Sequence, residues 1–371
     1  MATVTTPLSG SAADVAAPRA DVPLAEHTTL RLGGPAASFL DATTSDEIVE
    51  AVTAADSSAS PVLVLGGGSN LVVSDSGFPG SVVRIATTGR RFDRVDESTV
   101  EFTAEAGENW DDVVADVVDQ QLAGFECLSG IPGRVGAVPV QNVGAYGIEV
   151  AEVLRSVDLL DRRTGTTSTV PAAELGLAYR TSVLKGQDDA VVLRARFGLR
   201  PGPDSVPIRY PELARTLGVE VGSRAPIAEV RRAVLGLRAG KGMVLDPSDP
   251  DTWSAGSFFT NPFVAQADLP ETLDRIAAEA GSEVPVPQYP AGEGHVKLSA
   301  AWLIERAGFH KGHAGPGGRV ALSGKHTLAL TNRGGATTEE LLGLAREVRD
   351  GVENAFGIEL HPEPILVNCS L

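Results

Sequence analysis

The stretch CLSGIPGRVGAVPVQNVGAYG, from Cys127 to Gly147, decides how the rest of the chain is organised. It combines five glycines and two prolines with the amides Gln141 and Asn142. Glycine accepts positive φ and allows close backbone approach, whereas proline fixes φ. Neither a helix nor a regular strand tolerates both residues at this density. The sequence therefore predicts a long, stiff, irregular loop, which we call the central loop.

A surface linker and a ligand-binding loop are the two interpretations of this stretch. Linkers are usually polar, but the central loop carries Ile131, Val135, Val138, Val140, Val143 and Tyr146. A semi-apolar loop punctuated by Gly and Pro is more often buried against a ligand than left in solvent. The composition of the loop therefore favours ligand binding.

The composition of the whole chain restricts the classes of function. The 371 residues suffice for two or three domains. A net charge of −17 argues against nucleic acids and anionic membranes as main partners. Two cysteines are too few for a disulfide framework and fit a reducing compartment. No run of about 18 apolar residues occurs, and the Ala/Thr/Ser/Pro-rich start does not resemble a signal peptide. We expect a cytoplasmic protein with a disordered tail over residues 1–21.

Local patterns alternate between strands and helices, which predicts an α+β fold. Capping signals open helices after Thr44, Asn109 and Thr337. Further expectations are a strand at Thr327–Thr331 and a helix whose apolar face begins at Leu298.

The glycine run GGGSN, from Gly66 to Asn70, lies between two apolar strands, where backbone amides can surround a phosphate. The signal is weak, because a glycine turn is more often only a turn. Neither a G-x-G-x-x-G fingerprint after a strand nor a P-loop occurs.

The sequence leaves the role of one basic cluster undecided, and it argues against a metal site at a pair of histidines. Arg231, Arg232, Arg238 and Lys241 form a basic cluster that is either a solvated helix face or a counter-charge for a diphosphate. His310 and His313 lack a third ligand at convincing spacing, so we expect no metal.

Seven motifs occur in an order that closely resembles the UDP-N-acetylenolpyruvoylglucosamine reductases of peptidoglycan synthesis. They are VLGGGSNL, AGENW, IPGRVGAVPVQNVGAYG, YRTSVLK, AGSFFTNP, VKLSAAWLIE and HPEP. The resemblance runs from about His27 to Val367. Tyr210 and the segment around Tyr289 resemble the members of this family that close an aromatic loop over the substrate.

This resemblance implies a domain organisation. An FAD-binding domain of two α+β subdomains, similar to the vanillyl-alcohol-oxidase type, would span residues 22–200, with subdomains at about 22–86 and 87–200. A connecting segment would span 201–245. An α+β substrate-binding domain would span 246–371, with a C-terminal segment that returns to the active site.

The resemblance also implies cofactors and partners. FAD would be held non-covalently, NADPH would donate the hydride, and the substrate would be UDP-N-acetylglucosamine enolpyruvate. We expect a monomer without nucleic-acid or membrane partners. By motif, the residues matching the family's flavin contacts are Gly66, Gly67, Gly68, Ser69, Asn70, Gly130, Gly133, Gln141, Asn142, Gly144, Ala145 and Gly147.

Three further residues match the family's catalytic groups. Arg180 would hold the substrate carboxylate, since a planar guanidinium suits it. Ser257 would donate the proton, and Glu363 would share or relay charge. The residues matching substrate contacts are Tyr210, Lys241, Asn261, Tyr289, Lys311 and His326. Pro364 departs from the pattern, since an aliphatic residue is expected after Glu363, and some relatives have an amide in place of His326.

Two other functions compete with the reductase interpretation. A related FAD oxidase or dehydrogenase would share the flavin motifs but would leave AGSFFTNP and HPEP without a reason. A flavin- or nucleotide-binding protein without turnover would have no use for a proton donor beside a carboxylate clamp.

Overall fold

The computed structural model describes residues 17–281, 283–292 and 294–371 of the chain, so most of the predicted tail lies outside the described residues. The chain forms two compact units. The first unit contains residues 36–68 and 79–240 together with the segment that ends at Val22, and the second contains residues 23–35, 69–78 and 241–371. The first unit thus continues beyond residue 200, where the sequence analysis ends the FAD-binding domain. Compact units are not the same as functional domains, so the domain limits given there remain predictions.

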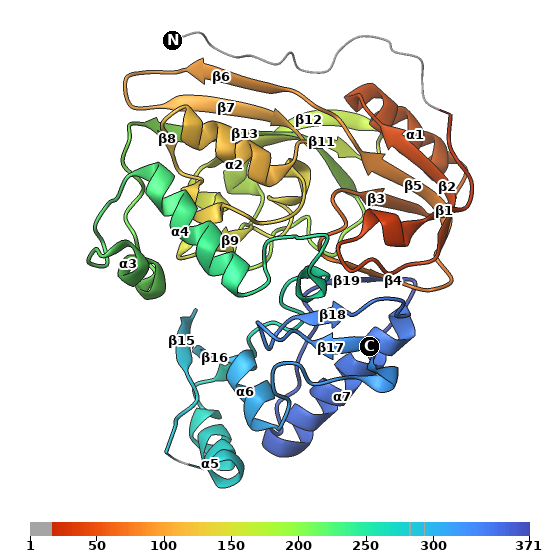
Figure 1. Ribbon diagram of the computed structural model, residues 1–371. Helices are drawn as coiled ribbons and strands as arrows, with labels where there is room; N and C mark the ends of the chain where they lie inside the picture. Colours follow the sequence, from red (N-terminus) through yellow and green to blue (C-terminus); the bar gives the residue numbers. More distant parts are fainter. Residues whose placement is uncertain (1–16, 282, 293) are drawn as a thin grey trace. The chain divides into compact units, whose positions relative to one another are not determined.

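The first unit contains two main sheets (Figure 1). A four-stranded sheet has the order β1-β2-β5-β3, in which β3 and β5 are parallel. A six-stranded sheet has the order β12-β11-β13-β7-β6, with β8 added to β13. The strands are β1 (Val22–Pro23), β2 (Pro35–Ala42), β3 (Val62–Leu65), β5 (Phe78–Ile85), β6 (Arg90–Arg94), β7 (Val100–Glu105), β8 (Leu122–Ala123), β11 (Leu154–Asp161), β12 (Thr166–Pro171) and β13 (Ala190–Pro201), and the pair β9 (Gly144–Ala145) and β10 (Ile148–Glu149) is separate.

Helices of the first unit begin where the capping signals predict. Thr44 and Glu47 form a reciprocal capping box at the start of α1 (Ser45–Ser57). The Asn109 side chain accepts hydrogen bonds from two backbone amides of α2 (Trp110–Asp119). The apolar face of α2 is buried with the six-stranded sheet, and the ring centroids of Trp110 and Phe197 lie 6.1 Å apart. Figure 1 shows α2 lying across this sheet.

The segment after β13 packs on the start of the central loop. It contains α3 (Pro211–Leu217) and α4 (Ile227–Gly240), whose apolar residues form a cluster with Cys127 and Ile148. Burial raises the pKa of the Cys127 thiol far above its ordinary value. The fully buried Glu126 carboxylate accepts hydrogen bonds from Gly124 N at 2.7 Å and from Val206 N at 2.6 Å. Glu126 therefore links the predicted connecting segment to the predicted FAD-binding domain.

The second unit is also α+β, so the predicted fold class is confirmed. Its core surrounds the long helix α7 (Thr338–Phe356) and contains the helix residues Leu341, Leu344, Ala345, Val348 and Val352. Asp75, after β4, accepts hydrogen bonds from the first amides of α7. The elements are β4 (Leu71–Val73), β14 (Phe263–Ala265), α5 (Leu269–Ala280), β15 (Gln288–Ala291), β16 (His295–Leu298), α6 (Ala300–Arg306), β17 (Val320–Leu322), β18 (Leu330–Asn332), α7 (Thr338–Phe356) and β19 (Ile365–Val367).

Two expected elements of the second unit are wrong in position. Leu298 is the last residue of β16, because Ser299 caps α6 and the helix begins only at Ala300. The strand expected at Thr327–Thr331 runs from Leu330 to Asn332. A turn precedes it, closed by the hydrogen bond from Ala329 N to the His326 carbonyl at 3.1 Å.

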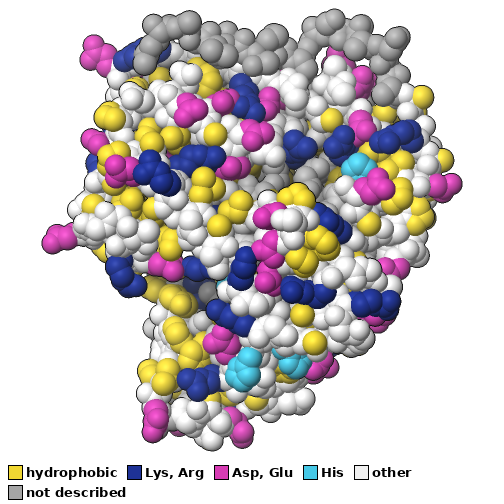
Figure 2. Space-filling view, in the orientation of Figure 1, with side chains coloured by type: hydrophobic (Ala, Val, Ile, Leu, Met, Phe, Trp, Pro, Cys, Tyr) yellow, Lys and Arg dark blue, Asp and Glu magenta, His cyan; other side chains and the backbone are white. Residues whose placement is uncertain are grey.

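Acidic and basic side chains are interspersed on the face drawn in Figure 2. Several arginines of the first unit form ion pairs, since Arg162, Arg196 and Arg231 each pair with an aspartate. On the face drawn in Figure 2, acidic and basic side chains are therefore mixed and do not form separate patches. None of the helices among the described residues is long and apolar enough to cross a membrane.

We expect Glu126→Gln to lower the free energy of unfolding by about 1–3 kcal/mol, because one buried amide loses its acceptor. Urea denaturation followed by circular dichroism measures the change. The exposed Glu174, which belongs to a one-turn 3-10 helix, supplies the matched control. Glu174→Gln should change stability by less than about 0.5 kcal/mol. Equal effects of the two substitutions would show that the Glu126 hydrogen bonds do not stabilise the fold.

Candidate active site

The two predicted flavin-binding loops meet in the first unit, backbone against backbone. A Cβ atom added to Gly67 would lie 2.9 Å from the Gly133 Cα atom, a distance that real side chains do not reach. A Cβ on Gly136 would lie 2.7 Å from the Ala106 Cβ atom. Glycine is thus required at these positions for steric reasons, and the two loops approach as closely as two backbones can.

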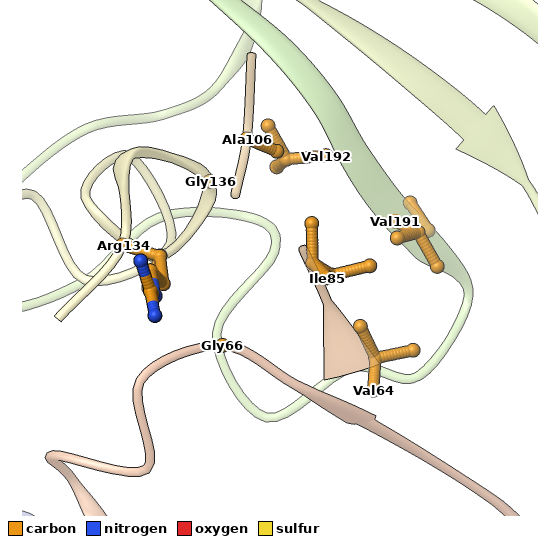
Figure 3. A pocket seen from close by; sticks show the side chains of 10 residues that line it. Val64, Gly66, Ile85, Ala106, Arg134, Gly136, Val191 and Val192 are labelled. Carbon is orange, nitrogen blue, oxygen red and sulfur yellow. The ribbon is translucent and has the colours of Figure 1, made fainter. Parts of the chain in front are cut away.

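A cavity of about 120 Å³ lies beside this contact (Figure 3). One side is apolar, from Val64, Ile85, Val191 and Val192, and the other carries Gly66 and Arg134. Arg134 belongs to the central loop but is not among the predicted contacts. The signal that could have found it is that Arg134 is the only charged residue between Cys127 and Gly147.

Asn142 holds the central loop from within. Its side chain accepts a hydrogen bond from Ala151 N at 3.0 Å and donates to Glu149 Oε2 at 2.8 Å and to the Ala178 carbonyl at 3.0 Å. Asn142 is fully buried and has φ = +45°, a conformation that asparagine tolerates better than most residues. Its amide therefore organises the loop from inside the protein.

Hydrogen bonds and close packing within the protein also fix the positions of other predicted flavin contacts. Gly130 N donates to Asp111 Oδ1 at 2.6 Å, and Ala145 pairs with Ile148 in the β9–β10 hairpin. A Cβ on Gly147 would lie 3.0 Å from the Arg209 Cβ atom. Gly68 is buried with φ = +59°, while Gln141 is half-buried. Ser69 and Asn70, which end the GGGSN run, belong to the second unit.

Arg180 lies against the central loop. It occupies a tight turn with φ = +54°, closed by two hydrogen bonds of 3.1 Å between the backbones of Ala178 and Thr181. Its guanidinium donates to the Gly144 carbonyl at 2.9 Å, and Lys185 Nζ donates to the Arg180 carbonyl at 2.8 Å. The turn thus places a guanidinium beside the predicted flavin loop.

In the second unit, the segments that carry Ser257 and Glu363 are adjacent. Glu363 N donates to the Phe258 carbonyl at 2.9 Å, and Thr260 N donates to the His361 carbonyl at 3.1 Å. Asn70 Nδ2 donates to the Glu363 carbonyl at 3.4 Å. Ser257 and Glu363 are both half-buried, so both remain within reach of a small ligand. Residues separated by about a hundred positions are therefore brought to one place.

The predicted substrate contacts are divided between the units. Tyr210 belongs to the first unit and meets the central-loop residue Tyr146 edge to face, with centroids 5.4 Å apart. In the second unit, the Asn261 side chain accepts a hydrogen bond from Ala300 N at 3.0 Å and so anchors α6. Tyr289 on β15 and Lys311 are exposed.

Lys241 and His326 lie on neighbouring segments of the second unit. A Cβ on Gly242 would lie 2.9 Å from the Asp251 carbonyl oxygen and 3.6 Å from Lys325 Cδ. Asp251 Oδ1 accepts from Gly324 N at 2.9 Å. This packing holds the residues that follow Lys241 against the turn that carries His326.

The structure partly answers whether the basic cluster of Arg231, Arg232, Arg238 and Lys241 is a solvated helix face or a counter-charge for a diphosphate. Burial acts to raise the pKa of Asp111, but its pairing with Arg231 at 2.6 Å and the hydrogen bond from Gly130 N together hold that pKa below its ordinary value. Arg231 is thus a structural partner of the carboxylate that also binds Gly130 N. Burial lowers the pKa of Arg238. His313 contacts Glu347 at 3.0 Å, and the described residues contain no group of three or more His, Cys, Asp or Glu side chains that could hold a metal.

Comparison with known proteins identifies the family. Residues 247–367 match the UDP-N-acetylenolpyruvoylglucosamine reductase C-terminal domain, and residues 36–170 match an FAD binding domain. The UDP-N-acetylenolpyruvoylglucosamine reductase of Saccharopolyspora erythraea is 66% identical over 96% of this chain and 98% of its own length, and that of Thermobifida fusca is 54% identical over 95% and 98%. The crystal structure of the reductase from Thermus caldophilus superposes with a TM-score of 0.62 at 26% identity, covering 94% of this chain and 99% of that one. The chain therefore belongs to the UDP-N-acetylenolpyruvoylglucosamine reductase family.

Proposed function

We propose that this chain uses FAD and NADPH to reduce UDP-N-acetylglucosamine enolpyruvate to UDP-N-acetylmuramate in peptidoglycan precursor synthesis. The family relationship supports the reaction, and the match of residues 36–170 to an FAD binding domain supports the cofactor. We further propose that the enzyme acts as a monomer in the cytoplasm and has neither nucleic acid nor membrane as a partner.

The first unit fits FAD on the chemistry of its lining. Backbone from two glycine loops can approach a phosphate closely, and the apolar wall of the cavity suits an aromatic ring. Gly66, Gly67 and Gly68 would hold the cofactor from one side, and Gly130, Gly133, Gly144 and Ala145 from the other. When bound, FAD supplies hydride transfer from NADPH to the substrate.

Arg180 and Ser257 would have different roles toward the substrate: the first stabilises negative charge and the second donates a proton. Hydride arriving at the outer carbon of the enolpyruvyl group drives negative charge into the neighbouring carboxylate, and the planar guanidinium of Arg180 would stabilise this charge. Ser257 would then donate its hydroxyl proton to the adjacent carbon. A serine is a weak acid, so it must be held close to that carbon and resupplied with a proton.

The adjacency of the Ser257 and Glu363 segments carries the catalytic part of this proposal. The hydrogen bond from Glu363 N to the Phe258 carbonyl fixes the HPEP segment beside the residue that follows Ser257. Glu363 would share or relay the charge that develops near this serine. Lys241 and Lys311 would act as point charges on the diphosphate, with Asn261 and His326 as polar contacts and Tyr210 and Tyr289 as aromatic covers.

Visible absorption spectroscopy of the purified protein tests the function. A flavin spectrum that bleaches anaerobically with NADPH and recovers only with UDP-N-acetylglucosamine enolpyruvate is expected. Recovery only on admission of oxygen would instead favour the oxidase. A protein that binds no FAD would contradict the proposal.

We expect Ser257→Ala to leave bleaching by NADPH unchanged but to slow recovery by the substrate by about 10²–10⁴-fold, because only the second step needs the proton. Stopped-flow absorbance of the bound flavin separates the two steps. Ser257→Cys, which restores a donor, should recover part of the rate. Substrate-driven recovery at the wild-type rate in Ser257→Ala would exclude Ser257 as the acid.

We expect Gly67→Ala to destabilise the FAD-free protein by about 1–3 kcal/mol and to weaken FAD binding, because its methyl group would force the two glycine loops apart. Gly66→Ala is the matched control, since its Cβ would meet Arg134 at an ordinary 3.6 Å, and neither glycine has a positive φ. Denaturation of the FAD-free proteins measures the difference. Equal free energies of unfolding for the two variants would contradict the prediction, because the loops could then move apart without loss of stability.

A further inference from the structure

Arg134 lies in the wall of the cavity beside the two glycine loops. It precedes the short 3-10 helix Val135–Ala137, and its Cβ and Cγ atoms would both lie 3.6 Å from a Cβ on Gly66. Figure 3 shows the Arg134 side chain next to Gly66, on the side of the cavity opposite Val191. The cavity is therefore asymmetric, with a cation and glycine backbone facing an apolar wall.

Arg134 forms no ion pair with the described residues of the protein. Its NH1 atom donates to the Gly107 carbonyl at 3.1 Å, and no carboxylate oxygen of the described residues lies within 4 Å of its guanidinium. By contrast, arginines of the same unit that form ion pairs include Arg90, Arg162, Arg194 and Arg231.

The surroundings of Arg134 also disfavour its charge. Burial and then the positive charge of Arg84 lower the pKa of Arg134, and the carboxylates of Asp112 and Glu108, which form no ion pair with it, oppose this only in part. Arg84 itself pairs with Asp41. A guanidinium that is partly desolvated, repelled by a second one and not directly paired with a carboxylate is stabilised when an anion binds.

We propose that Arg134 binds the diphosphate of FAD through its guanidinium. The planar fork donates two parallel N–H bonds to phosphate oxygens, which backbone amides of the glycine loops can also approach. The apolar wall formed by Val64, Ile85, Val191 and Val192 then lies where a ring of the cofactor can pack. The inference rests on the proposed FAD-dependent function.

The uridine diphosphate of the substrate offers the same chemistry, but the position of Arg134 favours the cofactor. Gly66, Gly67, Gly133, Arg134 and Gly136 all lie within residues 36–170, which match the FAD binding domain. The predicted point charges for the substrate diphosphate, Lys241 and Lys311, belong to the other unit.

Titration of FAD-free protein with FAD and with riboflavin, which has no phosphate, tests the proposal. Arg134→Met removes the charge but keeps most of the stem, and we expect it to raise the Kd of FAD by about 10–100-fold, as for loss of a charge-assisted hydrogen bond. Arg134→Lys should recover part of the affinity. Riboflavin should bind the wild type and Arg134→Met equally. The FAD affinity of the wild type should fall more steeply with added KCl than that of Arg134→Met.

Three results would overturn the proposal. The first is an unchanged Kd of FAD in a folded Arg134→Met protein. The second is an equal loss of FAD and riboflavin affinity, which would mean that Arg134 only maintains the shape of the cavity. The third is weaker binding of UDP to the FAD-loaded variant with unchanged FAD binding, which would assign the guanidinium to the substrate. A wild-type protein that binds no FAD would instead contradict the proposed function itself.

Discussion

The contact between the backbones of Gly67 and Gly133 is the constraint on which the flavin-binding part depends. It leaves no room for a side chain on Gly67, so the surface next to the contact is built from backbone. Hydrogen bonds fix the same loop to the residues around the start of α2, from Trp110 N to the Gly133 carbonyl at 3.1 Å and from Val135 N to the Glu108 carbonyl at 3.0 Å. Backbone that is held in place by these bonds and carries no side chain at Gly67 allows a phosphate to approach closely.

Asn142 connects this binding surface to the predicted chemistry. Both its amide oxygen and its amide nitrogen are used inside the protein, and one bond reaches the carbonyl of Ala178, which begins the turn that carries Arg180. The Arg180 guanidinium in turn donates to the Gly144 carbonyl of the central loop. Loop and turn thus share one hydrogen-bond network, and a buried network of this kind is costly to satisfy only in part. A shift of the central loop would therefore also displace Arg180, the arginine proposed to hold the substrate carboxylate.

Local features of the fold were predictable from the sequence, whereas contacts between distant segments were not. The capping boxes at Thr44 and Thr337 depend on residues three positions apart, so they can be read directly. Leu298 was assigned to a helix because apolar spacing alone cannot distinguish the end of β16 from the first turn of α6. The resemblance supplied Ser257 and Glu363, but neither periodicity nor spacing could show that their segments pair. The sequence distinguishes Arg134 only as the one charged residue of the central loop, whereas its lack of an ion pair among the described residues and its position beside Gly66 are properties of the folded chain.

The net charge of −17 and the phosphate-bearing ligands proposed for this chain are compatible because local pairing decides where positive charge is available. In the first unit, Arg194 and Arg196 face Asp158, and Arg231 faces Asp111, so these guanidinium groups are neutralised by neighbours. Such pairs stabilise the fold but attract a further anion weakly. Arg134 differs from them because its hydrogen bond goes to a carbonyl, which carries no net charge. In an acidic protein, an anion site is therefore better indicated by an arginine without a directly paired carboxylate than by the number of arginines in a cluster.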